Sequence, residues 1–552
     1  MSSKKVPRQS EKTRVCIVGA GSVGVYAARE ALKQGWEPTV YETAPMVGGV
    51  WRSGHHWDSL TTNSSSKMME VGDFPFPFQT SSEFPTRVEI CKYVEAYAAS
   101  FTLTKYIVFG TTVKSIEPVH KEDPMTKWVV RTTAERSPIQ FFDVVFCATG
   151  QYNVPSLPAC LVAYTAAAAA GRKRTRSSAQ VLHSSQFRSG DIHARGKNVL
   201  VLGLGNSALD IALEAIESNA KRVVVACRQG SLMLPIRADD GSPMDKAIVT
   251  RLFEYMQPKQ LRAYRTMKEA FEVTKVFESH GMPKILDQGI NPLHLRVSNL
   301  KEKEKWIKYV KNGQVMFHSS GDILSLENNK VLFEDGSCLN EIDVIVACTG
   351  YKTGGHDTFK YLPKVILDGC CISYKVPISS NDNVDKERER PVTTLCLHRR
   401  TMHPIYPTLC FLAQVQTFGN EAVVGGFQAR WAVCMLSQCS RVTKPLTFKG
   451  IQDDVVARKT FLFKNTPLFP GFVGYVKFMD TLAADIGALP PPLVKVGTWL
   501  DNPKLAWALL TGPLVQAQYS LCSDDKAEVK MARNIIHLVL ERFQSGRRRS
   551  KL

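Results

Sequence analysis

Two glycine-rich hexapeptides are the residues of this sequence whose chemistry is easiest to name. Gly19-Ala20-Gly21-Ser22-Val23-Gly24 and Gly203-Leu204-Gly205-Asn206-Ser207-Ala208 each follow a short apolar run and open a segment of helical composition. The first glycine of such a loop permits a tight turn, and the second lets the backbone approach a pyrophosphate. The third position lets the helix pack closely on the strand and tolerates alanine. A pyrophosphate then binds the free N–H groups at the helix N-terminus, so the sequence predicts two dinucleotide sites.

The residue that ends the next expected strand differs between the two loops. After the first loop it is Glu42, whose carboxylate accepts hydrogen bonds from a free ribose diol and repels a 2′-phosphate. After the second loop it is Arg228, whose guanidinium offers a charge and a planar fork of donors that suit a 2′-phosphate. The contrast predicts FAD at the first loop and NADPH at the second. A surface arginine at a strand end remains the alternative for Arg228, and Asp210 joins the residues expected at the NADPH site.

The elements around these loops predict the fold. Apolar strand-like runs alternate with helical patterns around both loops, which is typical of parallel sheets covered on both faces. Two further apolar runs, 144–148 and 344–348, are each followed at once by a Thr-Gly pair. Each is expected to close one nucleotide-binding half. Because the second loop lies between them, we expect an α/β fold of two nested Rossmann-like dinucleotide-binding domains with a helical C-terminal extension.

The same order of expected elements predicts the domain boundaries. The expected parts are the FAD-binding domain, the inserted NADPH-binding domain, the remainder of the FAD-binding domain, the C-terminal extension and a basic tail, at 12–160, 161–340, 341–442, 443–545 and 546–552. The stretch from Tyr164 to Ser178 contains five consecutive alanines and a basic run, so 161–180 is expected to be a low-complexity surface insertion rather than structure.

Composition excludes several classes of protein. The 552 residues are 44% hydrophobic and 22% charged, as in ordinary globular proteins, and no run reaches the roughly 18 apolar residues of a transmembrane helix. The polar, basic residues 1–13 do not resemble a secretory signal. The net charge of +19 arises largely from this tail, Arg172–Arg176 and Arg547–Lys551, without a nucleic-acid module, so no nucleic acid partner is expected.

Cysteine and histidine usage is equally informative. Fourteen cysteines occur without any C-x-x-C, which argues against a zinc ribbon and a redox dithiol and favours reduced thiols. The twelve histidines show no ligand spacing, so no metal site is expected. The final residues, Ser550-Lys551-Leu552, match a peroxisomal address that an import receptor reads, with a merely basic, frayed terminus as the alternative.

Several longer blocks resemble the flavin-containing monooxygenases, in particular the animal-type branch that oxygenates nitrogen and sulfur, over nearly the whole chain. The similar blocks are Gly48-Gly49-Val50-Trp51, 60–65 with Met68-Met69 and 73–77, Gln428-Ala429-Arg430-Trp431-Ala432, and 502–506 with Gly512-Pro513. The late segment departs at Asn502, where the family has aspartate. The resemblance implies that Gly49, Val50 and Trp51 lie against the flavin and that Thr62 and Asn63 belong to the cofactor site.

The identifying motif of that family is only half present. His183-Ser184-Ser185-Gln186-Phe187 keeps its second half, but Ser177 and Ala179 replace the aromatic residue and the glycine of the first half. This departure puts the local geometry of the linker in question. Baeyer–Villiger relatives carry tryptophan at the position of Phe187, so Phe187-Arg188 favours the heteroatom-oxygenating branch.

The resemblance also implies a reaction. NADPH would reduce FAD, and the reduced flavin would take up molecular oxygen as a C4a-hydroperoxide that oxygenates a small molecule with a soft nitrogen or sulfur atom. Asn63 is the expected catalytic side chain, because the matching asparagine contacts both flavin and nicotinamide; a simple turn residue is the alternative. Other possibilities are a Baeyer–Villiger monooxygenase, an uncoupled NADPH oxidase and a non-catalytic FAD-binding protein. The physiological substrate and the oligomeric state do not follow from the sequence.

Overall fold

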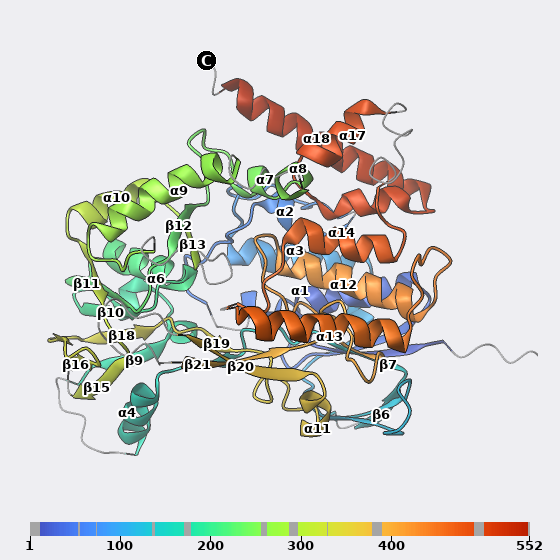
Figure 1. Cartoon of the computed structure of the whole chain (residues 1–552), viewed down its shortest axis with the longest axis horizontal. Coiled ribbons are helices and arrows are strands. Elements are labelled where there is room, and N and C mark those ends of the chain that lie inside the picture. The colour runs from blue at the N-terminus through green and yellow to red at the C-terminus, as the bar shows by residue number, and fades with distance from the viewer. Residues whose placement is uncertain are drawn as a thin grey trace, which may run out of the picture.

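The computed structural model describes most of the chain from residue 12 to residue 549. The residues outside the description are 1–11, 53–55, 73, 135–137, 171–177, 256–261, 286–295, 328, 378–388, 468, 491–501 and 550–552. The basic run Arg172–Arg176 falls among them, whereas Arg547–Arg549 are described. Within the described part, two parallel sheets stand side by side, each with its own helices, and a set of C-terminal helices covers one of them (Figure 1).

The first unit is built on a five-stranded parallel sheet of order β22-β7-β1-β2-β3. Its strands are β1 (Arg14–Val18), β2 (Glu37–Tyr41), β3 (Ile107–Val108), β7 (Val144–Cys147) and β22 (Leu409–Phe411). On one face pack α1 (Ser22–Lys33), α3 (Arg87–Ser100) and α12 (Glu421–Leu436). The other face carries the antiparallel β4 (Val113–Pro118), β5 (Trp128–Thr132) and β6 (Ile139–Phe142). Strands β1, β7 and β22 are almost entirely apolar because both faces of the sheet are covered.

The second unit, residues 180–347, repeats this plan with the order β14-β11-β10-β18-β9, also parallel throughout. Its strands are β9 (Gln180–His183), β10 (Asn198–Leu202), β11 (Arg222–Cys227), β14 (Val315–Ser319) and β18 (Val344–Ala347). Helices α6 (Asn206–Glu217), α9 (Arg262–Glu278) and α10 (Lys303–Lys311) belong to it, as do the antiparallel β15 (Ile323–Glu327), β16 (Lys330–Phe333) and β17 (Cys338–Leu339).

The predicted nesting is confirmed, because every strand of the second sheet lies in sequence between β7 and β22. One expected boundary is wrong. It placed the end of the inserted domain at residue 340, yet β18 pairs with both β10 and β9 in the second sheet. The boundary therefore falls after Ala347, since removing β18 would separate two paired strands of one sheet.

Short elements connect the two units. The strands β8 (Val154–Pro155) and β19 (Tyr351–Lys352) pair where the chain leaves the first unit and returns to it. The hairpin β20 (Cys371–Pro377) and β21 (Glu389–Leu395) lies beside β19, between the two sheets in Figure 1. An excursion of the second unit contains β12 (Leu232–Pro235), α7 (Asp245–Ile248), α8 (Arg251–Tyr255) and β13 (Val297–Leu300). It reaches the first unit at α7 and α8.

The C-terminal extension packs on the first unit, as its apolar side chains join the same core as β1 and α1. It contains α13 (Phe448–Asn465), α14 (Tyr475–Asp485), α17 (Pro503–Thr511), the 3-10 helix η5 (Gln516–Cys522) and α18 (Lys526–Arg549). The departing Asn502 caps α17, since its Oδ1 accepts the Leu505 N–H at 3.0 Å. The expected separate tail from residue 546 is wrong up to Arg549, because α18 continues to that residue; Ser550–Leu552 lie outside the described residues.

The expected unstructured insertion is also wrong over most of its described length. Residues Ala159–Ala169 form the helix α4, which alanines favour because they have the highest intrinsic helix propensity. Leu161 is fully buried against the second unit, and the Tyr164 hydroxyl donates to the carbonyl of Ala179 at 3.2 Å. The basic run at 171–177 lies outside the described residues.

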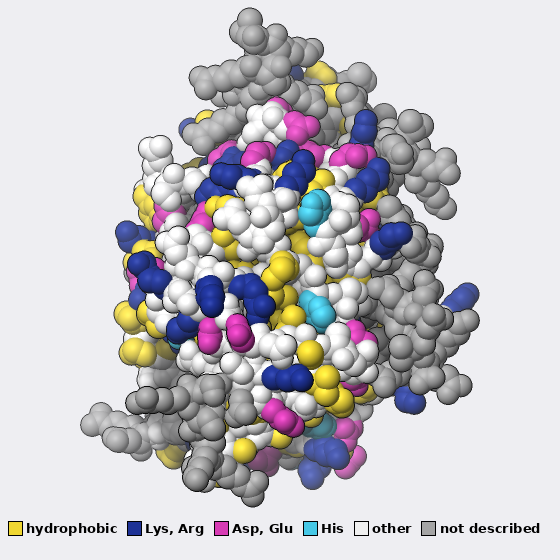
Figure 2. All heavy atoms as spheres, turned by 90° about the vertical axis from the view of Figure 1, so that its left-hand side faces the viewer, with side chains coloured by type: hydrophobic (Ala, Val, Ile, Leu, Met, Phe, Trp, Pro, Cys, Tyr) yellow, Lys and Arg dark blue, Asp and Glu magenta, His cyan; other side chains and the backbone are white. Residues whose placement is uncertain are grey.

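The surface charges and the cysteines also bear on the expectations from the sequence. On the face formed by the second unit, basic side chains are interspersed with acidic ones rather than gathered into one patch (Figure 2). No helix within the described residues is long and apolar enough to cross a membrane. All fourteen cysteines are described, and all are free thiols.

Candidate functional site

The first glycine loop connects β1 to α1 at the carboxyl edge of the first sheet. Gly19 has a φ of +103° and donates its N–H to the Tyr41 carbonyl at 2.8 Å. A Cβ on Gly19 would lie 2.8 Å from the carbonyl oxygen of Ala148, directly after β7. A Cβ on Gly24 would lie 1.9 Å from the Gly19 oxygen. Glycine is therefore required at both positions, since the backbones leave no room for a side chain.

The Gly48–Trp51 turn lies against this loop. The Gly48 N–H donates to the Ala20 carbonyl at 3.1 Å, and a Cβ on Gly49 would lie 2.9 Å from the Gly21 Cα. Val50 is exposed, whereas Trp51 packs at the edge of the apolar core. Ser22 and Val23 begin α1, so the N-terminus of this helix follows directly on the loop and the turn.

Glu42 follows β2 and turns its carboxylate to the same place. One oxygen accepts the Ala20 N–H at 2.6 Å, and the other accepts the Ala44 N–H at 2.7 Å. The acid thus fixes the backbone of the glycine loop. Each carboxylate oxygen keeps a second lone pair, so the expected contact with a ribose diol is compatible with these bonds.

The second loop repeats this geometry. Gly203 has a φ of +106°, donates its N–H to the Ala226 carbonyl at 2.8 Å, and would place a Cβ 2.6 Å from the Cys348 oxygen. Cys348 follows β18 as Ala148 follows β7. A Cβ on Gly205 would meet no atom within 4 Å, so the loop opens onto free space at its centre. Ala208, at the third position, is fully buried.

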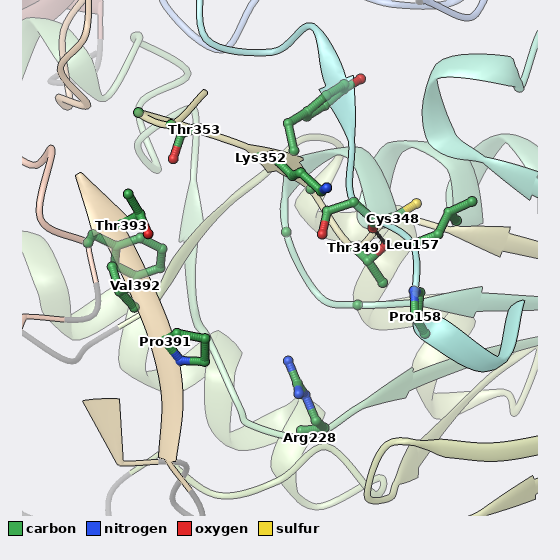
Figure 3. Close-up of a pocket in the computed structure, with 18 of the residues that line it drawn as sticks. Leu157, Pro158, Arg228, Cys348, Thr349, Lys352, Thr353, Pro391, Val392 and Thr393 are labelled. Carbon is green, nitrogen blue, oxygen red and sulfur yellow. Dashed lines mark hydrogen bonds between the residues drawn. The ribbon is translucent and has the colours of Figure 1, made fainter. Parts of the chain in front are cut away.

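The second loop opens into a cavity of about 1490 Å³ that extends to β21 and to Tyr152, which follows β7. Arg228 projects into this space, with Val392 on one side and Thr349 on the other (Figure 3). Its guanidinium is not free: Nη1 lies 2.9 Å from an oxygen of the Asp322 carboxylate. Arg228 therefore follows β11 and lines the cavity next to the second glycine loop, and it is ion-paired with Asp322.

The other expected residues of the second site face elsewhere. The Asn206 Oδ1 accepts the Asn299 N–H at 2.8 Å, and Asp210 is ion-paired with Lys301 at 2.6 Å. Burial raises the pKa of Asp210, although the Lys301 charge opposes the shift. Neither Asn206 nor Asp210 lines the cavity described above. Both hold the end of β13 against α6, and Ser207 is partly buried in the first turn of that helix.

Asn63 lies in a loop next to α2 (Ser66–Met69), which covers the first unit. Thr62 is buried, donates its N–H to the Pro85 carbonyl at 2.9 Å and its hydroxyl to the Ser64 carbonyl at 2.8 Å. The Asn63 Oδ1 is itself buried and has no hydrogen-bond partner among the described residues. A buried amide oxygen without a protein partner is costly unless a ligand or a water supplies a donor, so this atom is available to accept such a hydrogen bond.

Two acidic residues that contact the Asn63 loop and the cavity lining carried no recognisable sequence signal. Asp245 of α7 accepts the Ser65 N–H at 2.6 Å. Glu421, at the start of α12, accepts the Tyr152 hydroxyl at 3.2 Å. Burial raises the pKa of Glu421 to about 7, although the hydrogen bond from Tyr152 lowers it. Both acids act on residues far away in the sequence, so no local motif could have revealed them.

The retained half of the identifying motif makes specific side-chain contacts. The His183 ring contacts the Ser185 hydroxyl through Nδ1 and the Gly350 carbonyl through Nε2, both at 2.9 Å. Phe187 is fully buried in the second unit. Ala179 is fully buried before β9. A cluster of three or more residues that could hold a metal ion does not occur among the described residues.

Comparison with known proteins agrees with this geometry. The family model "Flavin-binding monooxygenase-like" matches residues 12–546. The rat flavin-containing monooxygenase 3 is 27% identical over 93% of this chain and 90% of its own length. The guinea pig dimethylaniline monooxygenase [N-oxide-forming] 2 is 28% identical over 92% and 88%. A solved OTEMO complex with FAD and NADP has a TM-score of 0.59 at 17% identity and covers 86% of this chain and 97% of that one. The chain belongs to the flavin-binding monooxygenase-like family.

Proposed function

We propose that the protein is an NADPH-dependent monooxygenase that uses FAD and molecular oxygen to oxygenate small molecules at a soft nitrogen or sulfur atom. The observation that carries the proposal is the buried, unpaired Oδ1 of Asn63, in a loop that both nucleotide-binding units hold. FAD occupies the first glycine loop and NADPH the second. This assignment rests on Glu42 and Arg228 at the ends of β2 and β11.

The protein residues bind and orient the cofactors and do not themselves provide the reactive groups. When bound, the flavin provides the oxygen-activating chemistry and NADPH provides the electrons. The N–H groups of the two glycine loops receive the pyrophosphates. The Asn63 amide can donate to one cofactor and accept from the other with a single side chain. The buried strands and helices around the loops exclude water from the place where the cofactors meet.

Two observations support oxygenation of nitrogen or sulfur rather than of a ketone. The guinea pig relative is named for N-oxide formation and matches nearly the whole chain. In addition, Phe187 stands where Baeyer–Villiger relatives carry a tryptophan, and it is fully buried in the second unit.

Product analysis tests the proposal. The purified FAD-loaded protein is supplied with NADPH and, in separate reactions, with a tertiary amine, a thioether and a cyclic ketone. We expect an N-oxide or sulfoxide in amounts that match NADPH consumption. A lactone as the main product would favour the Baeyer–Villiger reaction, and hydrogen peroxide alone would indicate an uncoupled oxidase. Protein that retains FAD but never oxidises NADPH would be a non-catalytic flavoprotein.

We further propose that the protein is imported into peroxisomes through Ser550-Lys551-Leu552. A fluorescent protein carrying the last residues of this chain is expected to collect in peroxisomes. Removal of Leu552 should return it to the cytosol, because the receptor reads the terminal residue and its carboxylate. Unchanged location of the shortened protein would refute this targeting.

A further inference from the structure

The loop that carries Asn63 is held by two side chains of the second unit. Two residues before Asn63, the carbonyl of Thr61 accepts a hydrogen bond from the Lys301 ammonium at 3.1 Å. Two residues after it, the Ser65 N–H donates to the Asp245 carboxylate at 2.6 Å. Both bonds go to main-chain atoms of the loop. They therefore set the position of the backbone on either side of Asn63, whatever its own side chain does.

Lys301 connects this loop to the second glycine loop. Its ammonium also lies 2.6 Å from the Asp210 carboxylate on α6, the helix that the second glycine loop opens. The two side chains are only 12% and 11% exposed, so the pair is held in a narrow geometry rather than on a mobile surface. A displacement of α6 when a dinucleotide binds at its N-terminus would therefore move Lys301, and with it the Thr61 carbonyl.

Asp245 supplies the second contact from a separate element. It is only 7% exposed, and its other carboxylate oxygen has no hydrogen-bond partner among the described residues. The neighbouring Lys246 turns to Glu83 of the first unit, at 2.9 Å. Burial raises the pKa of Asp245, while the bonds from Ser65 lower it. The Asp245 carboxylate therefore binds the backbone of the Asn63 loop at Ser65.

We propose that Lys301 and Asp245 are positioning residues that set the Asn63 loop from the NADPH-binding unit, so that occupation of the second nucleotide site orders the asparagine. The inference deepens the proposed function and rests on the role given there to Asn63. Because coupling between two sites is reciprocal, a variant that loses these contacts should lose the effect of NADP⁺ on the loop as well as the efficiency of oxygenation.

Hydrogen–deuterium exchange of the FAD-loaded protein measures the coupling directly. In the wild type, saturating NADP⁺ is expected to slow amide exchange in residues 61–66 by about fivefold or more. Lys301→Met and Asp245→Ala should abolish most of this protection. Lys301→Arg and Asp245→Asn, which retain a donor and an acceptor, should restore much of it. FAD content and melting temperature confirm that each variant is folded.

Lys305→Met is the matched control. Lys305 pairs with Glu217 at the other end of α6, at 2.7 Å, but both side chains are exposed and this ion pair lies away from the Asn63 loop. The control should behave as the wild type in exchange and in turnover. In Lys301→Met, by contrast, the share of NADPH that ends as hydrogen peroxide should rise about fivefold or more, while the KM for NADPH rises by no more than the coupling that is lost, about fivefold.

The possible outcomes separate this inference from the proposed function. Equal NADP⁺-dependent protection in Lys301→Met and Lys305→Met would overturn the positioning role, even if the wild type oxygenates amines and thioethers. A wild type that shows the protection but forms no oxygenated product would refute the proposed function and leave the coupling between the two units established.

Discussion

The guanidinium of Arg228 lies 2.9 Å from the carboxylate of Asp322 within the cavity of the second unit. The two residues belong to different elements, since Arg228 follows β11 and Asp322 precedes β15. Both side chains are partly exposed, so the pair contributes at most about 1 kcal/mol and a phosphate can displace the acid at low cost. The ion pair is therefore compatible with the phosphate-binding role proposed for Arg228.

Arg228→Ala is expected to raise the KM for NADPH about 10- to 100-fold, because a charge-assisted hydrogen bond to the 2′-phosphate is lost. The KM for NADH should change little, since NADH lacks that phosphate. Steady-state kinetics with both nucleotides measure the difference. Arg222→Ala, at the opposite end of β11, is the control, because its guanidinium donates to the Asn340 carbonyl instead. An equal effect on both nucleotides would contradict the assignment.

Asp322→Asn is expected to have the opposite effect. The amide cannot repel a phosphate or hold Arg228 in an ion pair, so the KM for NADPH should fall about threefold. The effect should shrink at high ionic strength, where exposed charges are screened. A higher KM for NADPH in this variant would mean that Asp322 orients Arg228 for binding rather than competing with the ligand.

Gly205→Ala is expected to weaken nucleotide binding without affecting folding. The added methyl group meets no atom within 4 Å, and the backbone at Gly205 is extended, so the melting temperature should stay close to that of the wild type. NADP⁺ affinity, measured by calorimetry, should fall at least about tenfold, because the methyl group occupies the approach of the pyrophosphate. Gly24→Ala should instead lose FAD or misfold, because its Cβ would lie 1.9 Å from a carbonyl oxygen. Normal NADP⁺ binding by Gly205→Ala would contradict the pyrophosphate site.

Glu421→Gln is expected to change how stability depends on pH. The pKa of Glu421 is raised from 4.5 to about 7 by burial, so the folded state prefers the neutral acid. This contribution is complete below pH 4.5 and is lost as the pH rises to about 7, at a cost of roughly 3 kcal/mol. Glutamine stays neutral and can still accept the Tyr152 hydroxyl.

Thermal unfolding at two pH values checks this expectation. The variant should melt with the wild type near pH 5 and about 3 °C above it at pH 8. The same difference between the two proteins at both pH values would mean that Glu421 does not titrate in this range.

Asn63→Ala and Asn63→Asp are expected to retain FAD but to lose oxygenation. Without the amide, the cofactors lose a group that both donates and accepts, so NADPH should be spent on hydrogen peroxide. The ratio of oxygenated product to NADPH consumed is the measurement. Wild-type coupling in either variant would rule out a catalytic role and favour a simple turn residue.

Much of the fold could be predicted from local patterns in the sequence. A glycine loop requires glycine for local steric reasons. Gly19 and Gly203 therefore predict a strand, a tight turn and a helix within a few residues. The same holds for the short apolar strands, which must be buried on both faces. Even so, β18 could not be assigned to its sheet from sequence, because its strand partners, not its composition, place it there.

The alanine run is a segment whose structure local sequence patterns do not predict. Five consecutive alanines are compatible with a low-complexity loop and with a helix, and the choice depends on what covers them. The burial of Leu161 and the hydrogen bond from Tyr164 to Ala179 favour the helix. Neither contact is visible in composition, because both depend on how α4 meets the second unit.

By itself, the sequence determined that this protein has two dinucleotide-binding loops, one followed by an acid and one by an arginine. Only the tertiary structure decided which groups share the site with them. Asp322 beside Arg228, Lys301 beside Thr61 and Glu421 beside Tyr152 are contacts between distant parts of the chain. The first pair meets within the second unit, the last within the first unit, and Lys301 and Thr61 meet between the two. Their physical basis is tertiary packing, which no spacing of residues along the chain encodes in a local form.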